Sequence, residues 1–462
     1  MIPTFKATAV ALLFTFIMGC GGGAAAPRGT AADQGAASGP ARAPEQIGGS
    51  LATAARPITG GAEDYREILS AAAGARRVLL GESTHGTHEY YRERGRITEM
   101  LVRDHGFNAV AVEGDWTPIR RLNDYVRGLG SDRSAEQAMG GLTGFPRWMW
   151  RNAEFRDFVE RLRLLNMARP AAERVGLYGM DVYDLFGAAD AAIAYLGRAD
   201  RAAAKQAEAH YRCFRRHGRS AHAYGEATRS GRTCQRQAEA VLALIRKLPR
   251  PTEAEAAERH FAAVRSAASV AAAEAYFRTV YAGSLAWNVR DQRMAQNVEE
   301  IAEHLQSLSG RAGKVVMWSH NTHSGDARAT FAADRGELNL GQLMRQRHGD
   351  DAFLLGFFSH GGTVLAASEW DQPGRVYDMR PALAGSYSAL FRTTGLPAFS
   401  LLLRGRPDVQ RHLKGPMLER AIGVVYQPHS ERMSHYFEAR LADQFDAAVY
   451  FDTTKAVTPL GR

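Results

Sequence analysis

The chain has 462 residues, of which 45% are hydrophobic and 23% are charged, so it is long and apolar enough to bury a large core. Its 58 basic and 49 acidic residues give a net charge of +9, and the basic residues are spread along the chain. Nucleic-acid binding needs clustered Lys and Arg with interleaved aromatic residues, and this pattern argues against it.

The N-terminus is predicted to be an export signal with a lipid attachment site. MIPTFKATAVALLFTFIMGC has one lysine and then an apolar run from Ala7 to Met18, which is short for a bilayer span and ends in small residues, as a secretory signal does. The ending IMGC resembles a bacterial lipobox, which implies that Cys20 is lipidated and anchors the protein to a membrane, facing the periplasm or the cell surface. An ordinary secretory signal is the alternative.

A tether is expected between this signal and the folded part. Residues 21–50 are rich in Ala, Gly and Pro and have almost no large apolar side chain, so they cannot bury enough surface to offset their chain entropy. We therefore predict a signal peptide over residues 1–20, a disordered tether over 21–50 and a folded domain over 51–462.

Short apolar runs separated by amphipathic segments predict the secondary structure of the folded domain. The expected strands are Arg77–Leu80, Ala109–Glu113, Val175–Tyr178, Lys314–Trp318, Ala352–Phe358, Thr363–Ala367, Phe399–Leu403, Gly423–Tyr426 and Ala447–Phe451. Helices are expected over Tyr91–His105 and Phe155–Asn166, where apolar residues recur at helical spacing, and over SHYFEARL near the C-terminus. Strand, helix and strand at this spacing predict an α/β fold with a largely parallel sheet flanked by helices.

From about residue 185 to 309 the sequence becomes Ala- and Arg-rich and helical, without a convincing strand. This stretch is too long for a simple crossover, so we predict an inserted helical subdomain. It holds Cys213 and Cys234, and an exported protein enters an oxidising compartment, where such a pair is typically a disulfide. Two separate thiols are the alternative.

Polar side chains follow several expected strands at their carboxyl ends. They are Glu82, His85, Glu113, Asp115, Asp181, His320, His323, Asp326 and His360. Carboxyl ends of parallel strands meet at one edge of a sheet, where ligands bind in open α/β folds, so these residues predict one shared site. Taken singly each has a simpler role, such as Asp181 as the N-cap of the next helix.

The residue types at this edge suit hydrolysis. A histidine beside a carboxylate, such as His85 after Glu82, can act as a general base on water, and a nearby arginine can orient carboxylates or stabilise an oxyanion. No G-x-S-x-G elbow is present, and Ser83 lies inside GESTHG without that context. We therefore favour activated water over an acyl-enzyme.

Several motifs together resemble the erythromycin esterase family. They occur in one order from about Gly81 to Asp452 and are GESTHG, Arg94, AVEGDW, the aromatic segment GFPRWMWRNAEF, WSHNTHSGDA and IGVVYQPHSERMSHYFEARLADQFDAAVYFD. The resemblance implies a hydrolase, free of metal and cofactor, that opens a macrolide lactone with water, as the antibiotic-resistance members do. A small-molecule ester or macrolide is therefore the expected substrate. An exported, lipid-anchored member with a cysteine pair differs from the cytoplasmic resistance enzymes.

The resemblance also implies a role for each site residue. His85 occupies the position of the general base, and Glu82 matches its supporting carboxylate. Arg94 matches the active-site arginine, and Glu113 matches the second glutamate. The second histidine belongs to HNTH and is either His320 or His323, with His323 favoured.

Two other functions remain open at this point. His85-Gly-Thr-His88 and His320-Asn-Thr-His323 are both H-x-x-H, which with Glu82, Glu113 and Asp181 could bind Zn²⁺ or Mn²⁺ in a metallohydrolase. A surface lipoprotein that binds a ligand without turnover is the other alternative.

Overall fold

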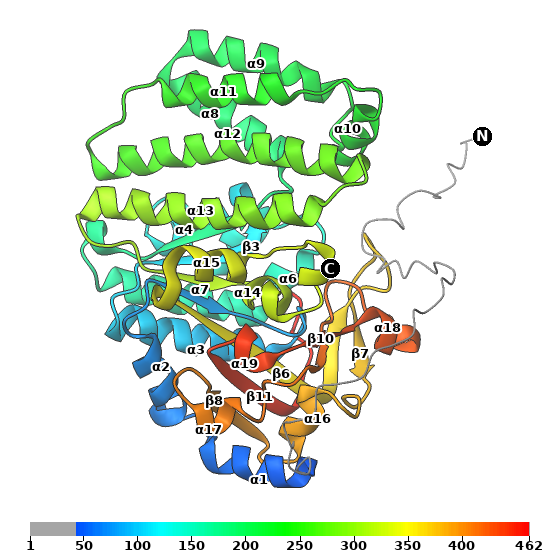
Figure 1. Cartoon of the computed structure of the whole chain (residues 1–462). Helices are drawn as coiled ribbons and strands as arrows, with labels where there is room; N and C mark the ends of the chain where they lie inside the picture. The colour runs from blue at the N-terminus through cyan, green and yellow to red at the C-terminus, as the bar shows by residue number, and fades with distance from the viewer. Residues whose placement is uncertain (1–42, 462) are drawn as a thin grey trace, which may run out of the picture.

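The computed structural model describes residues 43–461 (Figure 1). The expected signal peptide, the lipidation site Cys20 and most of the expected tether lie outside these residues, so lipid anchoring stays a prediction. Within residues 43–461, none of the helices combines the length and apolar character that a membrane crossing requires.

The folded part begins earlier than expected. Helix α1 (Pro44–Ala54) covers the end of the predicted tether and packs on α16 (Tyr387–Arg392). Gly48 and Leu51 are buried in this contact. The small residues of this segment suggested a disordered tether, but close packing against α16 requires a small residue here.

A mixed sheet forms the centre of the molecule. Across residues 43–461 its nine strands are β1 (Arg56–Pro57), β2 (Arg77–Leu80), β3 (Ala109–Asp115), β4 (Gly176–Asp181), β5 (Val315–Trp318), β6 (Ala352–Ala366), β7 (Arg375–Met379), β8 (Ala398–Leu402) and β11 (Ala447–Thr454). Their order is β1-β8-β11-β6-β2-β5-β3-β4, with β7 paired to β6. The strands from β11 to β4 are parallel, which confirms the predicted α/β class.

Helices cover both faces of this sheet. Successive strand residues point to opposite faces, so Val78 and Leu80 of β2 join one apolar cluster and Leu79 joins the other. The first cluster includes residues of α3 (His88–Asp104), α4 (Trp116–Val126) and α7 (Ala153–Met167). The second includes residues of α13 (Ala286–Ser309), α15 (Leu340–His348) and α16. Burial on both faces explains the continuously apolar strand sequences.

The segment predicted as a helical insertion is entirely helical. Residues 185–309 form α8 (Leu185–Ala199), α9 (Arg201–Arg215), α10 (Ala221–Thr228), α11 (Gln235–Arg246), α12 (Ala254–Tyr281) and α13. Figure 1 shows α8 to α12, in green, stacked beyond α13 and away from the sheet. They enclose an apolar cluster of their own. Cys213 and Cys234 form a disulfide, as predicted.

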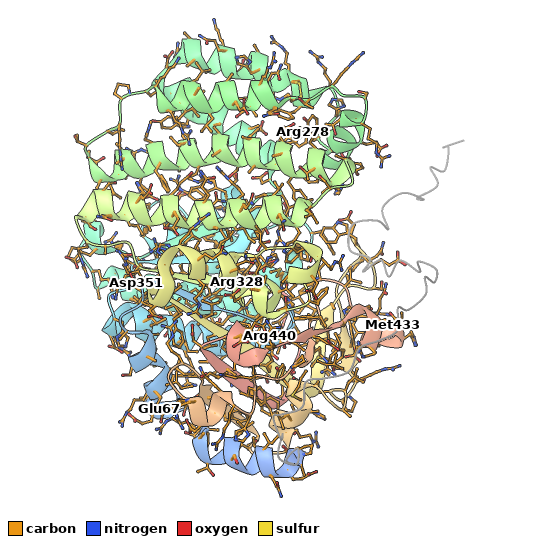
Figure 2. The ribbon with its side chains drawn as sticks, viewed as in Figure 1. Glu67, Arg278, Arg328, Asp351, Met433 and Arg440 are labelled. Atoms are coloured by element: carbon orange, nitrogen blue, oxygen red, sulfur yellow. A yellow bond between two sulfur atoms is a disulfide. The ribbon has the colours of Figure 1, made fainter. Side chains whose placement is uncertain are left out.

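The remaining elements are short. The helices are α2 (Arg66–Ala72), α5 (Ala135–Ala138), α6 (Arg147–Trp150), α14 (Asn321–Ser324), α17 (Pro407–Gln410), α18 (Glu431–Ser434) and α19 (Leu441–Gln444). The labelled charges Asp351 and Arg440 lie on the outside (Figure 2), in exposed ion pairs of the kind that contribute little to stability.

Strand β6 corrects one prediction. Two strands were expected over 352–358 and 363–367, separated by the turn-like SHGG, but they form one strand because Gly361 and Gly362 continue the pairing with Thr453 and Thr454 of β11. Gly362 has φ 110°, and a Cβ there would overlap the backbone of Thr454. The glycines therefore serve a close approach between strands, as glycine in a strand often does.

Two further predictions, both for C-terminal segments, are wrong. The helix predicted for SHYFEARL is wrong, because Tyr436–Ala439 form strand β10, antiparallel to β9 (Met417–Arg420). The strand predicted over Gly423–Tyr426 is also wrong. Its contact with β6's end is a single bridge between Ala367 and Val425, which is too little pairing to extend a ladder.

The disulfide generates a stability prediction. Cys213 and Cys234 are 21 residues apart, and opening a loop of this size gives the unfolded chain more conformational freedom. We expect the Cys213→Ala/Cys234→Ala variant to lose about 3 kcal/mol of unfolding free energy, measured by denaturant unfolding, with the sheet's own stability unchanged. Equal stability of the variant and the oxidised wild type would contradict this.

Candidate active site

Four neighbouring parallel strands bring the predicted polar residues to one edge of the sheet. Glu82 and His85 follow β2, Glu113 lies on β3, Asp181 ends β4 and His320 follows β5. The strand order β2-β5-β3-β4 puts these carboxyl ends side by side, which is where open α/β sheets bind ligands.

Backbone contacts hold the loop between β2 and α3. The N–H of Asn321 donates to the carbonyl of Glu82 at 2.7 Å, and the N–H of His85 donates to the carbonyl of Ile422 at 3.2 Å. Gly86 lies so close to the backbone of Leu365 that a Cβ at this position would overlap it. The GESTHG loop therefore has one tightly packed conformation, and its glycine permits the approach.

Glu82 is the buried carboxylate at the centre of the site. Its Oε1 accepts from Nδ1 of His85 at 2.9 Å, and its Oε2 forms an ion pair with Nη2 of Arg94 at 2.7 Å, with both side chains 0% exposed. The Arg94 guanidinium lies over the rings of Tyr91 and Trp318, 4.6 and 4.8 Å from their centroids. Because Nδ1 of His85 donates its proton to the Glu82 carboxylate, the lone pair of the neutral ring is on Nε2.

His320 is the histidine that faces His85. The two ring centroids are 4.9 Å apart. Nδ1 of His320 accepts from the N–H of Thr322 at 3.3 Å, so its proton is on Nε2, a buried atom that has no hydrogen-bond partner among residues 43–461. Burial and the charge of His85 lower the pKa of His320 well below 6.5, so this ring is neutral at pH 7.

Glu113 connects the two sides of the site. Its Oε2 accepts from the backbone N–H of His320 at 2.8 Å, and its carbonyl accepts from Nε1 of Trp150 at 2.8 Å. Burial alone would raise the pKa of Glu113, but its neighbours His323, Arg290 and His85 outweigh burial and hold that pKa well below 4.5, with Arg290 as the permanent cation among them. Glu113 is therefore an anion throughout the neutral range.

Arg290 is a site residue that the sequence reasoning missed. It lies on α13, is 6% exposed, and donates to Oε1 of Glu113 at 2.7 Å and to Oδ2 of Asp181 at 2.6 Å. Asp181 was expected to cap the next helix, and this is wrong, because Asp184 caps α8 by accepting from the N–H of Gly187. The sequence holds no local signal for Arg290, which is 177 residues from Glu113.

His323, the favoured candidate for the second histidine, is held by residues of α13. Its Nδ1 bonds Oδ1 of Asp291 at 2.8 Å, its Nε2 bonds Nη1 of Arg290 at 2.9 Å, and its ring stacks on Trp287 with centroids 4.3 Å apart. Both ring nitrogens are thus occupied. The geometry places His320, and not His323, beside His85.

Two other predicted histidines point elsewhere. His88 bonds Oε1 of Glu154 at 2.8 Å, so the pair His85 and His88 diverges. His360 lies inside β6, with Asp452 and Arg420 as charged neighbours. Among residues 43–461, no three His, Cys, Asp or Glu side chains are grouped as ligands of one metal ion.

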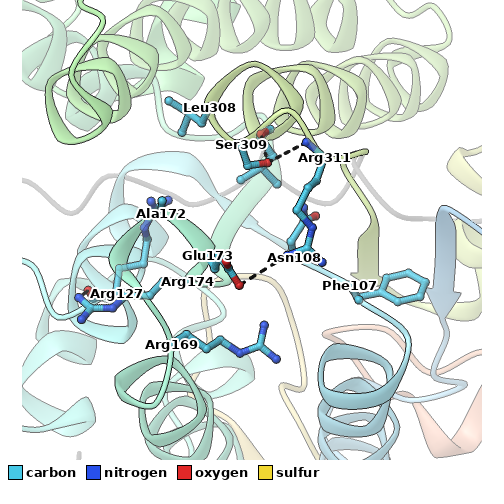
Figure 3. A pocket seen from close by; sticks show the side chains of 12 residues that line it. Phe107, Asn108, Arg127, Arg169, Ala172, Glu173, Arg174, Leu308, Ser309 and Arg311 are labelled. Atoms are coloured by element: carbon cyan, nitrogen blue, oxygen red, sulfur yellow. Dashed lines mark hydrogen bonds and ion pairs between the residues drawn. The ribbon is translucent and has the colours of Figure 1, made fainter.

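A pocket lies at the opposite, amino-terminal ends of β3 and β4 (Figure 3). Asn108, Arg127, Arg169, Arg174 and Arg311 line it. These arginines already donate to Glu258 and to the carbonyls of Val102 and Arg127, and Arg311 pairs with Glu173. The pocket is separate from the polar cluster, and its arginines are engaged in holding the chain.

A family comparison gives a clear result. Residues 102–454, more than half of the chain, match the family model described as Erythromycin esterase. The match begins after Glu82, His85 and Arg94, so the evidence for these three residues is their own geometry.

Solved structures share the fold. A succinoglycan biosynthesis protein is 19% identical with a TM-score of 0.72, covering 90% of this chain and 98% of its own. A Bacillus cereus protein is 18% identical with a TM-score of 0.72, covering 91% and 100%. A mutant of the erythromycin esterase EreC in its open conformation is 17% identical with a TM-score of 0.57, covering 84% and 93%.

Removing Arg94 is expected to destabilise the fold. In Arg94→Met the Glu82 carboxylate stays fully buried but loses its cation, which should cost about 3–5 kcal/mol of unfolding free energy. The double variant Arg94→Met/Glu82→Gln, which removes both charges, should recover part of this loss in urea unfolding. A double variant no more stable than Arg94→Met would contradict the charge argument.

His320 generates a pH prediction. Its pKa in the folded protein is well below 6.5, so below pH 6.5 the unfolded chain binds a proton at His320 that the folded protein does not. The unfolding free energy should therefore fall as pH drops below 6.5, with His320 contributing at most about 1.4 kcal/mol per pH unit. In His320→Gln this slope should be shallower across a urea-unfolding series; an unchanged slope would contradict it.

Proposed function

The chain belongs to the erythromycin esterase family, and from this membership we propose that it hydrolyses an ester or lactone with a water molecule activated by His85. The family supports an ester hydrolase in general. The mechanism and the macrolide substrate are our proposals.

One observation carries the mechanism: the bond of 2.9 Å between Nδ1 of His85 and Oε1 of Glu82. It orients the ring and leaves the lone pair on Nε2, which is the atom that would take the proton of attacking water. The Glu82 carboxylate then stabilises the imidazolium, and Arg94 forms an ion pair with the other oxygen of Glu82. The proton taken by His85 passes to the leaving alkoxide, so the reaction needs one water and no other reactant.

His320 supplies the complementary group. Its Nε2–H is buried without a partner in residues 43–461 and its ring lies 4.9 Å from that of His85, so it can donate to the oxyanion that forms as water attacks the carbonyl. A neutral donor is maintained because burial and the His85 charge keep the pKa of His320 low. We therefore assign the second histidine role to His320.

The proposed substrate class is tested by measuring the mass of the products. A panel of macrolides and simple esters, incubated with the protein, should contain compounds that gain the mass of one water. Loss of turnover with EDTA and stoichiometric bound metal would instead support a metallohydrolase.

We also propose that the protein works outside the cytoplasm, anchored through Cys20. The Cys213–Cys234 disulfide supports this, because disulfides persist in oxidising compartments. Labelling with a radioactive fatty acid in wild type and in Cys20→Ala tests the anchor.

His85→Asn tests the base. This variant should lose at least about 100-fold in kcat while still binding substrate in calorimetry, because the ring's proton acceptor is gone and the other residues of the site are unchanged. The matched control is His88→Asn, whose side chain is 34% exposed and bonded to Glu154, and which should keep its kcat. Full hydrolysis by His85→Asn would refute the mechanism, and binding without turnover in the wild type would identify a ligand-binding protein.

A further inference from the structure

Helix α13 presents three side chains to the candidate site. Trp287, Arg290 and Asp291 are spaced three and four residues apart, so they share one face of the helix. Arg290 and Asp291 are 6% and 0% exposed, and Trp287 lies nearly parallel to the His323 ring, at 9°. This helix is the last element of the helical insertion and packs on β4.

The guanidinium of Arg290 contacts three buried side chains. Nε and Nη2 donate to the two oxygens of Asp181 at 2.8 and 2.6 Å, and Nη2 also donates to Oε1 of Glu113 at 2.7 Å. Nη1 lies 2.9 Å from Nε2 of His323. Arginine has donors only, so Nε2 of His323 accepts, and the proton of that ring is on Nδ1, facing Asp291.

Both ring nitrogens of His323 are therefore hydrogen-bonded within the protein. Asp291 holds its Nδ1–H and Arg290 occupies its Nε2, whereas Nε2 of His320 has no hydrogen-bond partner among the described residues. His320 is the N-cap of the short helix α14 (Asn321–Ser324), and His323 lies in its last turn. Pinning His323 therefore fixes the end of α14, as Glu113 fixes its start through the N–H of His320.

We propose that Arg290 is a positioning residue that holds Glu113 and His323 in place and thereby orients His320 beside His85. It touches neither His85 nor His320, so it acts through Glu113 and α14. For its kinetic part this inference rests on the proposed hydrolase function.

The charges support the same conclusion. Glu113, Asp181 and Asp291 are each at most 5% exposed, and Arg290 contacts two of these three acids directly. Without its guanidinium, Glu113 would have only its histidine neighbours to oppose the effect of burial, so its protonation would be more favoured than in the wild type. A protonated Glu113 accepts more weakly from the N–H of His320, and the imidazole would lose its fixed orientation.

The test compares three variants of the full mature protein. Arg290→Met removes the guanidinium, and Arg290→Lys keeps one charge but cannot reach Asp181, Glu113 and His323 together. Arg293→Met is the matched control, because Arg293 lies on the same helix and donates to Gln296 instead of the site. The readouts are kcat and KM, and the ¹⁵N shifts of the two ring nitrogens of His323 from NMR of ¹⁵N-labelled histidine, assigned with His323→Gln.

We expect kcat to fall roughly 10- to 100-fold in Arg290→Met with KM little changed, to recover partly in Arg290→Lys, and to stay at the wild-type value in Arg293→Met. In the wild type Nε2 of His323 accepts from Arg290, so its ¹⁵N shift should change in Arg290→Met, whereas Asp291 keeps the proton on Nδ1 in both proteins. If Arg290→Met fails to fold, Arg290→Lys gives the same two readouts.

Other outcomes overturn the inference. Wild-type kcat in a folded Arg290→Met, or an unchanged ¹⁵N shift of His323 Nε2 in it, would show that Arg290 positions nothing. An equal loss in Arg293→Met would show a general effect on α13. Absence of ester hydrolysis in the wild type refutes the proposed function alone, because the Nε2 shift of His323 still decides whether Arg290 holds this ring.

Discussion

The site depends on one buried carboxylate, Glu82, that is shared between a cation and an imidazole. A fully buried acid is stable only where its charge is compensated, and here Arg94 forms an ion pair with Glu82 while His85 hydrogen-bonds its other oxygen. Glu82 and His85 lie in the loop after β2, and Arg94 lies on the next helix, α3. The rings of Tyr91 and Trp318 exclude water around the guanidinium, which strengthens the ion pair. The orientation of His85 thus follows from the local path of the chain.

The opposite wall of the site comes from distant parts of the chain. β3 contributes Glu113, β4 contributes Asp181, and α13 places Arg290 between them. Because α13 also belongs to the helical insertion, the insertion is part of the site's construction and not an independent appendage. The two walls meet at His320, whose backbone bonds Glu113 and whose ring faces His85.

The sequence predicts what local rules determine. Apolar runs located the parallel strands, and polar residues after them located the edge of the site, because strand ends and active sites coincide in this fold class. The pairing of His85 with Glu82 followed from a spacing of three residues in a turn. SHGG failed as a turn signal because Gly362 serves a close approach to Thr454.

Contacts between distant segments could not be predicted in the same way. Arg290 and Arg293 both lie on α13, and one sequence does not show which of these two arginines faces inward. The choice between His320 and His323 depends on which ring nitrogen is already occupied, and that is set by Asp291 and Arg290. The resemblance to a family identified the motifs and their order. The hydrogen-bond partners of the site residues became visible only in the three-dimensional structure.

The burial of the two facing rings has a kinetic consequence. His85 and His320 are 6% and 4% exposed. A bulky substrate therefore reaches the two rings only after the parts of the chain that cover them move apart. Such motion takes microseconds to milliseconds and often limits turnover in enzymes with covered sites. For large substrates the observed rate would then decrease as solvent viscosity increases. For small esters it would depend instead on the basicity of the leaving group.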